Sequence, residues 1–208
     1  MENTWLQFWN DRFRKEEYAY GTAPNTYLEE QLRSIQPVGK ILFGAEGEGR
    51  NSVYAAKSGW EVTAFDISEE GKNKAMQLAQ AHGVSLDYRI GELPKLQFPP
   101  QHFDVIALIY AHFPSAIKSL YHQLLDRYLK VGGTIIFEAF SKSHVAYRKR
   151  DEKVGGPIDL DILFSTEELQ MDFHNYNILE LVEKEVELRE GNGHIGLGSV
   201  IRFVGQKR

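Results

Sequence analysis

The amino-acid sequence predicts a three-layer α/β fold, in which a seven-stranded, mostly parallel sheet is covered by helices on both faces. Three observations predict it. Short apolar runs alternate with amphipathic helical stretches. A glycine-rich turn joins the first apolar run to a helix, and the chain ends in two long strand-like segments with a hairpin signal between them. Strands that alternate with helices imply right-handed crossovers and a parallel sheet.

The alternating part contains five expected strands, at Ile41–Phe43, Glu61–Phe65, Ser85–Ile90, Val105–Ile109 and Thr134–Ala139. The expected helices between them are Arg50–Lys57, Glu69–Ala81 and Ala116–Leu129. Ser115 is predicted to cap the last of these helices, and Gly132-Gly133 to stop the turn after it. A further short helix begins after a cap at Ser165 or Thr166. The final strands, Tyr176–Arg189 and Ile195–Gly205, are predicted to form an antiparallel hairpin.

Composition limits the class of protein. A chain of 208 residues, 42% hydrophobic and 25% charged, supports one globular domain with a sizeable core. The net charge is -5 with scattered Lys and Arg, which argues against nucleic acid as the main partner. There is no cysteine, so disulfides, thiolate metal sites and cysteine nucleophiles are excluded. No His and acid spacing is typical of a metal site, and no metal is expected.

The same features lead us to expect a cytoplasmic protein, either a monomer or a homodimer. The longest apolar run, Val105 to Ala111, is too short to cross a bilayer. No linker or repeat divides the chain. We therefore expect a single domain over 1–208, made of an N-terminal segment, 1–38, and a sheet domain, 39–208.

The stretch from Lys40 to Asp66 suits a ligand that carries a nucleoside. An apolar run enters a glycine-rich turn, a helix leaves it, and a second apolar run ends on the lone carboxylate of Asp66. Such turns also serve nicotinamide, flavin and phosphate sites, or only permit close packing. The Lys and Ser/Thr pair of a P-loop is missing, and the spacing of Gly44, Gly47 and Gly49 does not fit G-x-G-x-x-G.

Five segments in order resemble the motifs of the class I S-adenosylmethionine-dependent methyltransferases. They are Ile41 to Asn51, Asp66, Gly91-Glu92-Leu93, Phe103 to Tyr110, and Leu129 to Phe137. The resemblance covers about Phe8 to Lys207. It implies a Rossmann-like sheet, S-adenosyl-L-methionine as cofactor, and methyl transfer. Within the class, Tyr18 to Asn25 and the pair Arg50-Asn51 most resemble the branch of tellurite-resistance and thiopurine methyltransferases, which implies a small-molecule or soft oxyanion acceptor such as a thiol, selenite or tellurite.

The resemblance also implies which residues contact the cofactor. Asp66 would hold the ribose hydroxyls, Ile67 the adenine face, and Glu92 the adenine amino group. The alternative for Asp66 is a helix cap, a role that Ser68 could fill equally well, and the alternative for Glu92 is a solvated loop charge. The full set of expected cofactor contacts is Gly44, Ala45, Glu46, Gly47, Gly49, Arg50, Asn51, Asp66, Ile67, Glu92, Leu93, Ile109 and Tyr110.

The glycine loop departs from the family pattern at two positions. Ala45 stands where the family has its first glycine, and Phe43 stands where it has an acid that commonly helps hold the cofactor's amino group. Glu46, inside the turn, could supply a carboxylate instead. These departures motivate a second hypothesis, a non-catalytic protein that binds S-adenosylmethionine or S-adenosylhomocysteine. A nicotinamide oxidoreductase and an RNA methyltransferase are lesser alternatives.

The acceptor side of the site is predicted from aromatic residues and histidines. His112 follows the fourth strand and is either a general base or a residue that hydrogen-bonds the loop backbone. Trp9, Phe13 and Tyr20 are expected to cover the cofactor as a lid, whereas core packing is the expected role of Trp5 and Phe8. His194 and Arg189 flank the hairpin tip. This tip is either only solvated, as hairpin tips commonly are, or faces the acceptor together with Glu138 at the end of the fifth strand.

Overall fold

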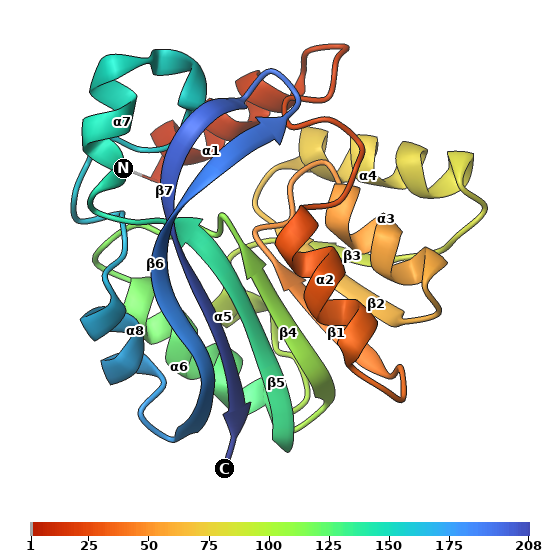
Figure 1. Ribbon diagram of the computed structural model, residues 1–208. Helices are drawn as coiled ribbons and strands as arrows, with labels where there is room; N and C mark the ends of the chain where they lie inside the picture. Colours follow the sequence, from red (N-terminus) through yellow and green to blue (C-terminus); the bar gives the residue numbers. More distant parts are fainter. Residues whose placement is uncertain (1) are drawn as a thin grey trace.

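The computed structural model describes residues 2–208, with side chains from Thr4 onward (Figure 1). Met1, the first residue of the expected segment 1–38, lies outside it. The helices of the described chain are α1 (Glu2–Phe13), α2 (Thr26–Ser34), α3 (Arg50–Lys57), α4 (Glu69–Ala81), α5 (Leu93–Leu96), α6 (Lys118–Tyr128), α7 (His144–Arg150), the 3₁₀ helix η1 (Glu152–Val154) and α8 (Thr166–Asp172). The strands are β1 (Lys40–Gly44), β2 (Glu61–Asp66), β3 (Asp87–Ile90), β4 (Phe103–Ile109), β5 (Leu129–Phe140), β6 (Tyr176–Glu190) and β7 (His194–Lys207).

The strands form one seven-stranded sheet in the order β3-β2-β1-β4-β5-β7-β6. Strand β1 pairs in parallel with β2 and β4, and β4 pairs in parallel with β5. Strand β7 runs antiparallel to both β5 and β6. The predicted mostly parallel sheet with a C-terminal antiparallel hairpin is therefore confirmed. The strand order reverses between β1 and β4, which is where ligands bind in open α/β sheets.

Helices cover both faces of the sheet and bury two separate apolar clusters (Figure 1). On one face α2, α3 and α4 contribute Leu28, Ala55 and Ala75 against the strands. On the other face α5, α6 and α8 contribute residues such as Leu93, Leu125 and Leu169. The central strands β1 and β4 are buried on both faces, as expected of parallel strands with helices on either side.

Helices α3, α4 and α8 agree with the sequence-based prediction, whereas two predicted end signals do not. Helices α3 and α4 have the predicted bounds, and Ser165 caps α8 in a capping box with Glu168. The predicted cap at Ser115 is wrong. Helix α6 begins at Lys118 after Ile117, because the carbonyl of Pro114 accepts the N–H groups of both residues in a turn.

The predicted turn at Gly132-Gly133 is also wrong. Strand β5 begins at Leu129, directly after α6, and both glycines lie inside it. The register with β4 shifts between Phe103 and Val105, and Gly132 has φ +78, so the glycines absorb an irregularity in the strand. Glycine therefore marks a bulge here and not a stop.

Helix α2 was not predicted, although its cap is readable in the sequence. The Asn25 side chain accepts a hydrogen bond from the N–H of Leu28 at 2.9 Å, which is the geometry of an N-cap. Its buried residues include Tyr27 and Leu32, which seat the helix on the sheet. The helix thus carries Asn25 to the carboxyl edge of the strands.

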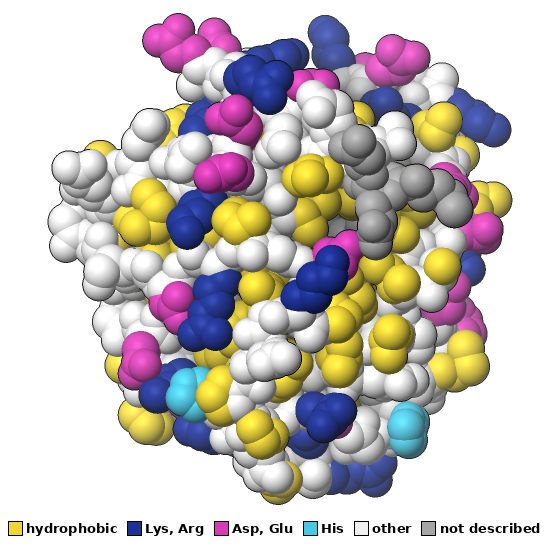
Figure 2. Space-filling model, turned by 180° about the vertical axis from the view of Figure 1, so that it is seen from behind, with side chains coloured by type: hydrophobic (Ala, Val, Ile, Leu, Met, Phe, Trp, Pro, Cys, Tyr) yellow, Lys and Arg dark blue, Asp and Glu magenta, His cyan; other side chains and the backbone are white. Residues whose placement is uncertain are grey.

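Figure 2 shows the side of the molecule opposite to that of Figure 1, where Lys and Arg side chains are interspersed with Asp, Glu and hydrophobic ones. Phe8 is 47% exposed, so its predicted core role is wrong. Its ring contacts Trp5, Trp9 and Arg12, which all lie on α1 itself. Over the described chain, every helix is too short or too polar to serve as a membrane span.

Candidate functional site

Four segments meet at the carboxyl edge of the sheet. They are the glycine loop, 45–49, after β1, the end of β2 at Asp66, the loop after β4 that contains Tyr110 and His112, and the tip of the β6–β7 hairpin, 190–194. They are far apart in sequence, and the parallel arrangement of β1, β2 and β4 brings three of them together. The site therefore lies at the position that the strand order predicts.

The glycine loop has a left-handed backbone at three positions, with φ +52 at Ala45, +63 at Gly47 and +86 at Gly49. Glycine is required at Gly49, where a Cβ would lie 2.6 Å from the Cβ of Ala75 on α4. At Gly47 a Cβ would lie 3.0 Å from the ring of Phe13. Ala45 adopts the conformation that the family's glycine would favour, at the energetic cost of a side chain in this region.

Asp66 is buried and holds the loop in place. Its Oδ2 accepts the N–H of Gly47 and its Oδ1 accepts the N–H of Ser68, both at 2.9 Å. Burial raises the pKa of Asp66, against the lowering effect of these hydrogen bonds. The hydroxyl of Ser68 accepts the N–H of Gly71 and so caps α4. The capping alternative for Asp66 is therefore wrong, because Ser68 has that role.

The residues expected near the adenine lie beside Asp66. Ile67 is partly buried and directly precedes the Ser68 cap. Leu93 is fully buried at the start of α5. Glu92 is at the N-cap position of α5, and its side chain is 33% exposed. Its carboxylate pairs with the ammonium of Lys95 at 2.7 Å.

Glu46 lies in the turn with its carboxylate beside the first turn of α3. Its Oε1 accepts the N–H of Ser52 at 2.7 Å. Burial raises the pKa of Glu46 to about 7, although the hydrogen bonds to Ser52 and the charge of Arg50 lower it. Phe43, at the position of the family's acid, is a buried core residue on β1. The loop thus carries one carboxylate that remains partly protonated near neutral pH.

A buried polar network joins α2, α3, β5 and the hairpin. The amide of Asn25 donates to Glu138 at 2.6 Å and to Glu190 at 3.0 Å. Glu138 pairs with Arg202 at 2.6 Å, and Glu190 pairs with Arg50 at 2.9 Å. Burial raises the pKa of Glu138. At Glu190 the charge of Arg50 and the hydrogen bonds from His194 and Asn25 together outweigh burial and lower its pKa to about 2.

The sequence indicated Glu138, Arg50 and Asn51 but missed the rest of this network. The side chain of Asn51 accepts the N–H of Asn25 at 2.9 Å, and so links α3 to the α2 cap. Glu190 and Arg202 carried no sequence signal, because they lie on the edge hairpin and meet Asn25 only after the chain has folded. In the sequence, Asn25 directly after Pro24 indicates a structured turn before α2.

His194 is 4% exposed and lies within a group of aromatic rings. Its ring centroid is 4.5 Å from that of Tyr20, 4.6 Å from that of Tyr110 and 5.0 Å from that of Phe140. Its Nδ1 donates to Glu190 at 2.7 Å, and burial lowers the pKa of the imidazole. Tyr110 has φ +53 and its N–H donates to the carbonyl of Glu138 at 2.7 Å, which fixes its direction.

His112 is bonded to the backbone through both ring nitrogens. Its Nδ1 donates to the carbonyl of Ile162 at 3.2 Å, and its Nε2 accepts the N–H of Phe140 at 3.4 Å. Burial lowers the pKa of His112 to about 3, so the imidazole is neutral. This geometry favours the backbone-bonding alternative over a general base.

The N-terminal residues expected near the cofactor reach the glycine loop. Trp9 stacks on Phe13 with centroids 5.4 Å apart, and Phe13 approaches Gly47. Asn10 hydrogen-bonds the hydroxyl of Ser68 at 2.6 Å. Arg12 donates to the hydroxyl of Tyr20 at 3.0 Å. Helix α1 therefore lies over the end of β2.

Hydrogen bonds hold residues 15–21 to α4 at one end and to the hairpin tip at the other. The carbonyl of Ala19 accepts the N–H groups of Asn192 and Gly193, at 3.1 and 2.8 Å. The ammonium of Lys74 donates to the carbonyls of residues 15 and 17, and it pairs with Glu48 at 2.6 Å. Glu48 in turn accepts the N–H of Ala19 at 2.8 Å. The glycine loop, α4 and the hairpin tip are connected through this segment.

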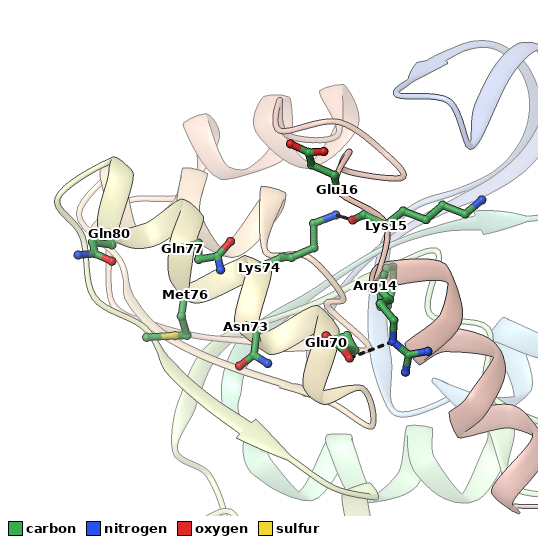
Figure 3. A pocket seen from close by; sticks show the side chains of 10 residues that line it. Arg14, Lys15, Glu16, Glu70, Asn73, Lys74, Met76, Gln77 and Gln80 are labelled. Atoms are coloured by element: carbon green, nitrogen blue, oxygen red, sulfur yellow. Dashed lines mark hydrogen bonds and ion pairs between the residues drawn. The ribbon is translucent and has the colours of Figure 1, made fainter.

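Figure 3 shows an open pocket of about 730 Å³ between α4 and the residues that follow α1. Its rim is polar and includes the ion pair of Arg14 and Glu70 at 3.3 Å. Phe13 lines this pocket and also approaches Gly47, so its ring separates the pocket from the glycine loop. Within the described residues, no cluster of three His, Cys, Asp or Glu side chains is arranged to hold a metal ion.

Residues 41–133 match the family model of a methyltransferase domain. This part of the chain is a methyltransferase domain. The match runs from β1 through the glycine loop, Asp66 and His112 to β5, and so contains most of the site. No curated protein matches the chain.

Solved structures with the same fold extend over the remainder. One comes from work on the conversion of a disulfide bond into a thioacetal group during echinomycin biosynthesis. It is 17% identical to this chain with a TM-score of 0.76, and the match covers 98% of this chain and 92% of that one. TehB from Haemophilus influenzae is 18% identical with a TM-score of 0.71, covering 98% and 67%. An S-adenosylmethionine-dependent methyltransferase from Methanosarcina mazei is 21% identical with a TM-score of 0.64, covering 86% and 96%. At these identities, they show the shared fold.

S-adenosylmethionine is the cofactor of this methyltransferase, and the residues at the strand ends fit it. Gly47, whose φ is +63, lies beside the carboxylate of Asp66 and under the ring of Phe13, so the loop backbone, an acid and an aromatic ring meet there. Glu46 offers a desolvated acid to a cationic ligand. When bound, the cofactor supplies a methyl group activated on a sulfonium. The glycine loop and Asp66 would hold its adenosine and methionine parts.

Proposed function

We propose that this protein transfers the methyl group of S-adenosylmethionine to a small-molecule or soft oxyanion acceptor, with thiols, selenite and tellurite as the acceptor class. The chain would align the acceptor with the methyl group and keep water out, since a sulfonium is already a good leaving group. In this reading the part of the N-terminal segment 1–38 that precedes α2 acts as a lid over 39–208, and the rings of Tyr20, Tyr110 and His194 line the acceptor side.

The observation that carries the proposal is the bonding of His112. A neutral imidazole with a pKa of about 3 and two backbone partners is a poor acceptor for a proton. Burial also raises the pKa values of Tyr20 and Tyr110, so both phenols keep their protons. An acceptor that needs deprotonation inside the site would find no ready base among these residues. Thiolates and the oxyanions of selenium and tellurium bring their own negative charge.

Two further features support a small acceptor. Residues 18–21 lie against the hairpin tip through the carbonyl of Ala19, and the ring of Tyr20 packs on that of His194. The charges on the face in Figure 2 are mixed in sign, unlike the single basic face that a nucleic acid favours. The neighbours named above are consistent with this class: one study concerned sulfur chemistry on a natural product, and TehB matches the branch that the sequence resembles.

The test is a transfer assay with methyl-labelled S-adenosylmethionine and a matched panel of acceptors. We expect label in at least one sulfur, selenium or tellurium product, at a rate that follows the ionisation of the acceptor and not that of an enzyme group. The control is Asp66→Asn, which should lose transfer along with cofactor affinity. Transfer only to neutral oxygen or nitrogen acceptors, or to RNA, would overturn the proposal.

A further inference from the structure

Five acidic side chains surround the glycine loop and the neighbouring strand ends, and three of them form ion pairs. Such pairing is what a carboxylate needs when it leaves water. The pairs, all between side chains with less than a fifth of their surface exposed, are Glu48 with Lys74 at 2.6 Å, Glu138 with Arg202 at 2.6 Å, and Glu190 with Arg50 at 2.9 Å. A fourth acid, Asp66, has both oxygens bonded to backbone N–H groups.

Glu46 is the exception. It forms no ion pair in the described part of the chain, and its one backbone hydrogen bond, from Ser52, uses Oε1. The neighbouring cation, Arg50, is already paired with Glu190. Burial without a cation is also the main reason that the pKa of Glu46 rises. The fold therefore holds a desolvated acid at the loop whose ionised form would be stabilised further by a cation.

We propose that the Glu46 carboxylate is the counter-ion of the α-ammonium group in the methionine part of the cofactor. This inference rests on the proposed function, since it requires S-adenosylmethionine at the glycine loop. The strand before the loop cannot supply the charge, because Phe43 is apolar and buried. Glu46 thus supplies from inside the turn the negative charge that the end of β1 lacks.

The cofactor has a second cation, the sulfonium, and the geometry favours the ammonium. The methyl group must face the acceptor side, where Tyr110 and His194 lie. The charges that act on these two rings come from Glu138, Glu190 and nearby arginines. Glu46 is instead bonded to the first turn of α3 through Ser52. It is therefore placed on the α3 side of the loop.

The test measures binding by calorimetry with three probes that all lack the sulfonium. They are S-adenosylhomocysteine, its deaminated analogue with the same carboxylate, and 5′-methylthioadenosine, which has neither the amino group nor the carboxylate. In wild-type protein we expect S-adenosylhomocysteine to bind at least tenfold more tightly than the deaminated analogue. In Glu46→Gln this preference should disappear, while the affinity for 5′-methylthioadenosine stays within about twofold.

The matched control is Glu69→Gln, which removes the same charge from an exposed position in the first turn of α4. It should keep the full preference for the amino group. Unchanged affinity for 5′-methylthioadenosine in Glu46→Gln also shows that the variant is folded. Proton release is a second readout, because an acid with a pKa near 7 is half protonated at pH 7. Binding of S-adenosylhomocysteine should release roughly half a proton in wild type and none in Glu46→Gln.

Three outcomes would overturn the inference. A preference for the amino group that persists in Glu46→Gln would place the ammonium elsewhere, and equal weakening of all three probes would give Glu46 a role in shaping the loop only. If a fourth titration, with S-adenosylmethionine, alone shows loss of affinity in Glu46→Gln, Glu46 is assigned to the sulfonium. If none of the probes binds wild-type protein, the proposed function itself fails, which is a distinct result.

Discussion

The N–H of Gly47 donates a hydrogen bond of 2.9 Å to Oδ2 of Asp66, so the acid that ends β2 holds the loop that follows β1. The other oxygen binds Ser68 at the start of the next helix connection. One carboxylate thus fixes the spacing between the two loops that would hold the cofactor. The sequence predicts that Asp66 binds the ribose hydroxyls. It would do so while its two oxygens also accept the N–H groups of Gly47 and Ser68.

Replacement of Asp66 by Ala should therefore destabilise the fold as well as weaken cofactor binding. Two backbone N–H groups would lose a charged acceptor, and we expect the free energy of unfolding to fall by about 2–4 kcal/mol. Asp66→Asn retains one oxygen as acceptor and should lose less. Urea denaturation measures both variants. Equal stability of Asp66→Ala and wild type would show that these two bonds contribute nothing.

Replacement of Gly49 by Ala should destabilise the protein by about 2–4 kcal/mol, from left-handed strain and from overpacking. The new Cβ would lie 2.6 Å from that of Ala75, and φ is +86. Gly83→Ala is the matched control, since its φ is +67 and nothing lies near the added atom. It should cost only about 1 kcal/mol. Thermal unfolding that ranks the two variants equally would contradict the close packing of α3 on α4.

Glu46→Gln should stabilise the cofactor-free protein at pH 8 and leave it unchanged at pH 4. The folded pKa of about 7 lies above the ordinary 4.5, so the folded state binds the proton more tightly and wild type loses stability as pH rises between these values. At roughly 1.4 kcal/mol for each pKa unit, the gain in Glu46→Gln is at most about 3 kcal/mol. Urea midpoints across this range test it. A gain of the same size at pH 4 would refute the titration of Glu46.

Lys74→Gln should loosen the proposed lid, and it also removes the ion-pair partner of Glu48 in the glycine loop. Its ammonium holds the carbonyls of Lys15 and Glu17 and pairs with Glu48. We expect amide hydrogen exchange across residues 15–25 to accelerate at least tenfold without cofactor, and S-adenosylhomocysteine to restore part of the protection. The exposed Lys57→Gln is the control. Unchanged exchange in Lys74→Gln would assign residues 15–21 to the rigid part of the fold.

Removal of residues 1–21 tests the lid more directly. The sheet buries its apolar clusters mainly against α2 to α6 and α8, so the truncated chain should fold. It should bind S-adenosylhomocysteine more weakly and transfer almost no methyl group, because Phe13 would no longer approach Gly47 and Tyr20 would no longer cover His194. Normal transfer by the truncated chain would reduce these aromatics to ordinary packing.

The sequence by itself determined the strand and helix alternation, the C-terminal hairpin, and the glycine loop followed by Asp66. Those features depend on local periodicity and on glycine spacing, which act over a few residues. The bounds of α3 and α4 were readable for the same reason. The cap at Ser115 failed because the carbonyl of Pro114 accepts the N–H groups of Ile117 and Lys118 in a turn before α6. The turn at Gly132 failed because pairing with β4 extended β5 back to Leu129.

Only the tertiary structure decided which charges are paired. Glu190 and Arg50 are 140 positions apart in the sequence numbering, and no local pattern relates them. No local pattern relates Asn25 to Glu138 either. The two hydrogen bonds between the His112 ring and the backbone also join residues that are distant in sequence. Glu46 has no ion pair in the described chain because the neighbouring Arg50 is paired with Glu190. Ion pairing and burial depend on neighbours in space, so the chemical role of each acid was set when the strand ends came together.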